Sequence, residues 1–74
     1  MISYQTLLNI VNNLPSGTIF IISDLFPPIQ WKAQPVRQRR LLGIRFLDDV
    51  QNGALPNIVP KGKNSSNAQL YNVL

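Results

Sequence analysis

The longest helical pattern in this sequence covers residues 35–52, and it limits the chain to folds built around one long helix. Pro35 suits the first position of a helix, because its fixed φ matches the helix and its missing N–H would have no partner there. Gly53 suits the C′ position, where the backbone turns left-handed. Val36, Phe46 and Val50 fall on the side of the helix expected to be buried. A chain of 74 residues is about half the usual domain size, so we expect one domain over residues 1–74.

Shorter elements are predicted on both sides of this helix. Residues 4–14 repeat apolar side chains at helical spacing, with Ser3 as the N-cap. Residues 18–22 are β-branched and aromatic, which is typical of a strand. Residues 23–26 begin a helical turn that Pro27 stops, and Pro28 starts a second short helix. The sequence therefore predicts a mixed α+β order before the long helix.

The end of the chain predicts a hairpin. Residues 58–60 and 69–74 have the composition of short strands, and residues 61–67 form a polar, basic loop between them. Pro60 cannot donate a hydrogen bond to a neighbouring strand, so its strand is expected at the edge of the sheet.

The composition favours a folded chain and excludes several classes of site. Hydrophobic residues make up 45% of the chain and charged residues 14%, which is too apolar for a disordered segment. Because there is no Cys and no His, we expect no disulfide, no metal site, no cofactor and no imidazole base. Such a small chain is expected to be stabilised by packing, helped by a second copy of itself.

No part of the sequence has the pattern of a membrane span. The longest apolar run is Ile19 to Ile22, far short of the roughly 20 residues that a span requires. The first four residues lack the basic region of a signal peptide. We therefore expect no membrane partner and a cytoplasmic location.

Positive charge is concentrated in one part of the chain. Seven Lys and Arg residues against three Asp give a net charge of +4, and five of the seven fall within residues 32–45. This sign is typical of proteins that bind nucleic acids. A solvated helix face on a basic protein accounts for the charge equally well.

The order helix, strand, short helix, long helix and hairpin resembles the winged helix-turn-helix domain. Residues 35–52 match its recognition helix, and residues 61–67 match its wing. The chain resembles more closely a small uncharacterised family of Firmicutes and phage proteins. The residues that carry this second resemblance are Gly17, Thr18, Phe20, Asp24, Leu25, Phe26, Trp31, Arg39 or Arg40, Leu42, Gly43 and Phe46. Both resemblances imply a DNA-binding fold, and Pro27-Pro28 departs from an ordinary winged helix.

The physical case for DNA binding is that a major groove about 12 Å wide accepts one α-helix. Arg reads guanine, Gln reads adenine and an exposed Leu contacts a thymine methyl. The outward residues in the first half of helix 35–52 are Arg37, Gln38, Leu41 and Arg45. Contacts with phosphates or the adjacent minor groove are predicted for Lys61, Lys63 and Asn64 on the hairpin, and phosphate contacts for Lys32 and Gln34 before the helix.

Several charged and aromatic residues have a structural interpretation. The helical repeat places Arg39 and Arg40 over the apolar side, where one of them can pack across Trp31 and pair with Asp24. Trp31 is expected to anchor the core. Two further carboxylates, Asp48 and Asp49, lie near the end of the long helix, where the helix dipole disfavours them. An ion pair with Arg45 would explain that position.

The sequence also bears on two other classes of function. Catalysis is not expected, because Asp48 and Asp49 point about 100° apart on a helix and no phosphate-binding loop is present. An interaction protein is the alternative, since Ile19 and Ile21 face outward if Phe20 faces the core, as a dimer surface or a docking site. The alternative includes phage anti-host or anti-CRISPR factors. The favoured hypothesis is a homodimer that binds double-stranded DNA as a transcriptional regulator or a phage architectural factor of the excisionase kind.

Overall fold

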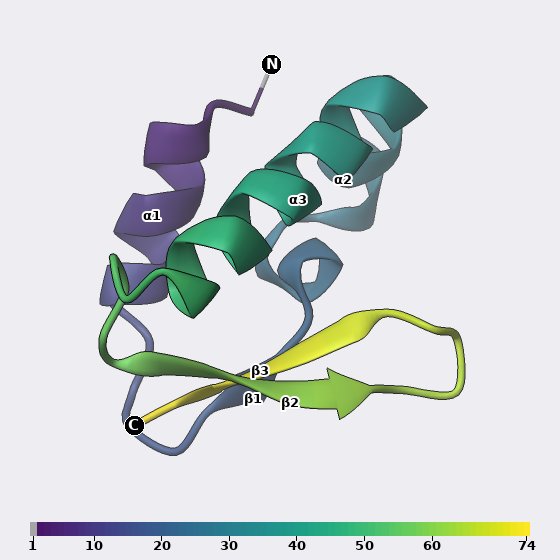
Figure 1. Ribbon diagram of the computed structural model, residues 1–74. Coiled ribbons are helices and arrows are strands. Elements are labelled where there is room, and N and C mark those ends of the chain that lie inside the picture. The colour runs from purple at the N-terminus through teal and green to yellow at the C-terminus, as the bar shows by residue number, and fades with distance from the viewer. Residues whose placement is uncertain (1) are drawn as a thin grey trace.

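The computed structural model describes residues 2–74, which form an α+β fold of three α-helices, a short 3₁₀ helix and a three-stranded antiparallel sheet (Figure 1). The elements follow in the order α1 (Tyr4–Asn12), β1 (Ile19–Phe20), η1 (Ile22–Leu25), α2 (Pro28–Ala33), α3 (Val36–Gln51), β2 (Ile58–Lys63) and β3 (Gln69–Val73). No helix within residues 2–74 is long and apolar enough to cross a membrane.

The helix boundaries follow the capping residues. The Ser3 hydroxyl accepts a hydrogen bond from the Thr6 N–H at 3.1 Å, which confirms it as the N-cap of α1. Pro28 opens α2, and Pro35 directly precedes α3. Gly53 follows α3 with φ +80°, the left-handed conformation expected at C′. α1 ends at Asn12 rather than at residue 14, because the chain tightens there: the Asn13 and Leu14 N–H groups donate to carbonyl oxygens three residues back. The turn predicted over residues 23–26 is η1, which begins one residue earlier.

The sheet has β3 at its centre and β1 and β2 at its edges. Phe20 of β1 lies opposite Tyr71 of β3, and Pro60 of β2 lies opposite the same Tyr71 on the other side. The edge position expected for Pro60 is therefore confirmed. The strand predicted over residues 18–22 is too long, since the chain turns into η1 directly after Ile21.

The core lies between the sheet and the helices and is centred on α3. The fully buried Phe46 ring lies edge-on to Tyr71, with ring centroids 4.8 Å apart, and also contacts Phe20 at 6.2 Å. Leu42 and Val50 extend this buried side of α3 by one turn in each direction. Val36 was expected on this side and is instead 58% exposed. Its turn opens α3 at the end that points away from the sheet (Figure 1).

Candidate functional site

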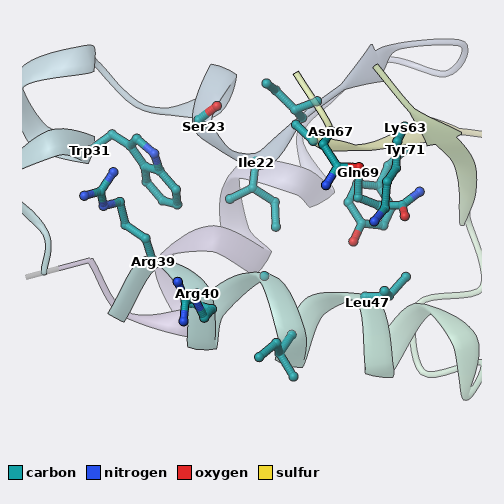
Figure 2. Close-up of a pocket in the computed structure, with 14 residues that line it drawn as sticks. Ile22, Ser23, Trp31, Arg39, Arg40, Leu47, Lys63, Asn67, Gln69 and Tyr71 are labelled. Atoms are coloured by element: carbon teal, nitrogen blue, oxygen red, sulfur yellow. The ribbon is translucent and has the colours of Figure 1, made fainter. Parts of the chain in front are cut away.

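A groove of about 700 Å³ separates one side of α3 from the hairpin formed by β2 and β3 (Figure 2). We call it the basic groove. Its α3 side is lined by Arg39, Arg40, Gly43, Ile44 and Leu47; its hairpin side by Lys63, Asn67, Ala68, Gln69 and Tyr71; and the rest by Ile21, Ile22, Ser23 and Trp31. The groove is therefore lined by segments that are far apart in the sequence.

The lining of the basic groove carries positive charge only. Arg39 and Arg40 lie at the end near Trp31, and Lys63 lies at the end formed by the hairpin (Figure 2). No Asp or Glu is among the lining residues. Arg40 and Lys63 are exposed and Arg39 is half-buried. Cations that line a concave surface without a neutralising carboxylate attract anionic ligands.

Arg39 is held in place by the turn between α2 and α3. Its Nε donates a hydrogen bond to the Gln34 carbonyl oxygen at 3.2 Å. Figure 2 shows its side chain beside Trp31, whose ring stacks on Phe26 at 5.7 Å with the two planes 8° apart. Arg39 thus has a backbone acceptor in place of the expected carboxylate of Asp24, which is exposed in η1.

The loop of the hairpin is shorter than predicted. Lys61 and Lys63 lie within β2, not in a loop over residues 61–67, because a register shift at Gly62, with φ +81°, carries the pairing past Pro60. The Asn64 Oδ1 accepts hydrogen bonds from the Ser66 and Ala68 N–H groups, at 2.9 and 3.0 Å. The Asn64 side chain, for which a DNA contact is predicted, therefore also shapes the loop through its oxygen.

The outer face of α3 is exposed, and it carries both charged and apolar side chains. Arg37 is exposed, as expected, and Leu41 is 51% exposed. Ile44, which the sequence pattern did not indicate as a site residue, is 59% exposed on the same face. Gln38, predicted to face outward, is half-buried.

Arg45 and Asp49 both contact Tyr4 of α1. The Arg45 guanidinium carbon lies 4.1 Å from the centroid of the Tyr4 ring, and the Tyr4 hydroxyl donates a hydrogen bond to Asp49. Burial, followed by this hydrogen bond, raises the pKa of Tyr4 well above its ordinary value of 10.0. These contacts join α1 to α3 and explain Asp49 near the end of α3. The ion pair expected between Arg45 and Asp48 or Asp49 is replaced by the Tyr4 ring.

The remaining predicted residues are more dispersed. The Gln34 Oε1 accepts a hydrogen bond from the Ile2 N–H at 3.0 Å, so this side chain joins the start of the chain to the α2–α3 turn. Lys32 is exposed in α2. Ile19 is 51% exposed on the edge strand β1, whereas Ile21 is half-buried and lines the basic groove, which corrects its expected outward position.

Gly43, Asn67 and Gln69 are among the residues of the basic groove that the sequence did not indicate as site residues. The signal for Gly43 was available, because a glycine inside a long helix lowers its stability and often reflects a packing or functional need. A Cβ atom at Gly43 would have no neighbour within 4 Å. The groove is therefore open at this position.

The fold and the groove define a small α+β domain with one basic concave surface. The chain matches a family model described as a domain of unknown function (DUF1413) over residues 5–72, and it belongs to that family. No curated protein and no solved structure matches the chain. The expectation of an uncharacterised family is confirmed, while the winged helix-turn-helix resemblance and a phage origin stay predictions.

Proposed function

We propose that this chain binds double-stranded DNA in the manner of a winged helix. The first half of α3 enters the major groove, and the backbone of one strand follows the basic groove between α3 and the β2–β3 hairpin, which acts as the wing. The observation that carries this proposal is the lining of the basic groove, where Arg39, Arg40 and Lys63 occur without a carboxylate.

The dimensions support this arrangement. α3 has 16 residues, about 24 Å at a rise of 1.5 Å per residue, and its outer face is free to enter a groove about 12 Å wide. A strand backbone borders the major groove along its whole length. A protein that places a helix in that groove and a hairpin across the strand therefore needs cations between the two, where Arg40 and Lys63 lie.

The side chains divide into two roles in this proposal. Arg37 and Leu41 on the outer face of α3 contact base edges, since both are exposed. Arg40, Lys61 and Lys63 contact phosphates, which position the protein without reading sequence. A domain of this kind acts as a transcriptional regulator or as an architectural factor on DNA.

Neutral variants of the groove cations test the proposal. Lys63→Gln and Arg40→Gln should each lower affinity for any duplex about fivefold to tenfold near 0.1 M salt, as expected for one lost phosphate contact. Gln5→Glu is the matched control, because it changes the net charge by the same amount at an exposed position on α1, which contributes nothing to the groove. Affinity is measured by fluorescence anisotropy. Equal losses in all three variants would mean that net charge alone determines the affinity and that the groove has no specific role.

A protein interaction module is the second candidate, and the exposed apolar side chains of α3 favour it. Val36, Leu41 and Ile44 are each more than half exposed, at 58, 51 and 59%. Apolar side chains in this arrangement are typical of surfaces that bind another protein. Electrostatic binding is strong at about 50 mM salt. If the chain shows no affinity for duplex DNA even there, the result would support this candidate, which includes phage anti-host factors.

A further inference from the structure

Four residues form a single line along the outer face of α3: Arg37, Leu41, Ile44 and Asp48. We call this line the outer stripe. Its spacing of four, three and four residues is the spacing of the a and d positions in a helix that packs against another helix. Leu41 and Ile44 at its centre are 51 and 59% exposed, and Arg37 and Asp48 at its ends are exposed. The buried side of α3 already faces the core, so the outer stripe is a second, unpartnered seam.

The outer stripe is complementary to itself when two copies run antiparallel. A two-fold axis through the middle of the stripe, between residues 42 and 43, places Leu41 beside Ile44 of the second copy. The same axis places Arg37 beside Asp48 of the second copy, at both ends of the contact. Each end then carries one ion pair, and the centre is apolar.

The charges also exclude the parallel arrangement. In a parallel pair Arg37 would lie beside Arg37, and Asp48 beside Asp48, so that both ends would repel. The other exposed cations of α3, Arg40 and Arg45, project from its opposite flanks, about 140° apart around the helix. The two-fold axis brings Arg40 near Arg40 of the second copy on one flank and Arg45 near Arg45 on the other. A parallel pair would bring Arg40 near Arg45, so these cations weaken both arrangements. The charges at the two ends therefore select the antiparallel direction, while Arg40 and Arg45 keep the pair weak.

We propose that the outer stripe is the docking surface for a second copy of this chain, which packs its own α3 antiparallel on it. The contact is short and falls below the roughly 800 Å² per partner of a standard interface. The dimer is therefore weak, and forms at protein concentrations of roughly 0.1–1 mM. This surface differs from the one expected at Ile19 and Ile21.

One consequence rests on the proposed function. Arg37 and Leu41 are the side chains that we place in the major groove, so a second copy on the outer stripe blocks DNA. Self-association and DNA binding then exclude each other, and the dimer is a storage form of the protein.

Exchange of the two charges tests the dimer without DNA. Arg37→Asp and Asp48→Arg, each alone, place like charges together at both ends and should weaken association at least tenfold in sedimentation equilibrium. The double variant Arg37→Asp with Asp48→Arg restores opposite charges and should associate within about threefold of the original chain. Both substitutions place favourable charges near the ends of α3 with respect to the helix dipole, so the variants are expected to fold.

Two results would overturn the proposal: an original chain that stays monomeric at about 1 mM, or a double variant that associates no better than the single ones. Circular dichroism of each variant verifies the fold. DNA affinity measured below about 1 μM, where the chain is monomeric, tests the proposed function separately, so failure of one does not imply failure of the other.

Discussion

Gly43→Ala should make this protein more stable, although it lies in the middle of its longest helix and beside its candidate site. Ala is favoured over Gly in a helix interior by about 0.8–1.0 kcal/mol, partly because Gly has more conformational freedom in the unfolded chain. This gain is realised only where the new methyl group has room. A Cβ atom at Gly43 would meet nothing within 4 Å, since it would point into the basic groove.

The expected size follows from the length of the chain. An unfolding entropy of about 2.1 cal/mol/K per residue gives about 155 cal/mol/K for 74 residues. A gain of 0.8–1.0 kcal/mol then raises Tm by about 5–6 °C. Thermal and urea unfolding followed by circular dichroism measure both quantities. An unchanged or lower Tm would mean that the position is filled and that the groove is closed there.

A larger substitution at Gly43 also tests DNA binding. Gly43→Leu keeps a good helix former but places a large side chain in the basic groove. Its affinity for duplex DNA should fall about as much as on loss of one phosphate contact, fivefold to tenfold near 0.1 M salt, whereas Gly43→Ala should stay within about threefold. Equal affinities for both variants would argue against a strand in this groove.

Three further predictions concern stability. Ser3→Ala removes the hydrogen bond to the Thr6 N–H and should lower the free energy of unfolding by about 1 kcal/mol in urea, whereas Ser3→Asp should retain it. Tyr4→Phe leaves the half-buried Asp49 without its hydroxyl partner and should lower the free energy of unfolding by about 1 kcal/mol in the same assay. An unchanged free energy would show that this hydrogen bond does not stabilise the fold. Burial raises the pKa of Tyr71 from 10.0 to about 12, so the unfolded chain loses this proton first, and stability that is complete below pH 10 should decline between pH 10 and 12. Tyr71→Phe should make that decline shallower and leave the part that comes from the raised pKa of Tyr4, and an equally steep decline would contradict the assignment.

The ends of the helices could be predicted from the sequence because capping is local chemistry. Ser3 caps α1 through a residue three positions away, Pro28 opens α2, and Gly53 adopts the left-handed backbone that ends α3. Each signal acts within one turn of the chain. Neighbouring residues therefore contain all the information that these boundaries need.

The extents of the strands depend on partners, and here the sequence was less informative. Residues 18–22 have strand composition throughout, but β1 covers only Ile19–Phe20, with Thr18 also bonded to Val73 of β3, before the chain turns into η1. Lys63 lies in β2 because a register shift near Gly62 extends the pairing. Both outcomes are set by hydrogen bonds to β3, which local composition does not encode.

Only part of the basic groove could be predicted from the sequence. The helical repeat correctly placed Arg39 over the apolar side of the long helix. Its acceptor is the Gln34 carbonyl oxygen rather than the Asp24 carboxylate that was expected for Arg39 or Arg40. The position of Lys63 across the groove depends on how the hairpin packs against α3. One helix and one strand, analysed separately, do not reveal which side chains they bring together.

The most direct measurement of the central claim is the salt dependence of DNA binding by the original chain and by Lys63→Gln. With the three phosphate contacts proposed for Arg40, Lys61 and Lys63, log affinity should fall with log salt concentration at a slope near −2.7, and loss of the Lys63 contact should bring the slope to about −1.8. The account predicts that Gln5→Glu leaves the slope of the original chain unchanged. A slope that Lys63→Gln leaves unchanged, or no measurable affinity at about 50 mM salt, would contradict a DNA strand in the basic groove.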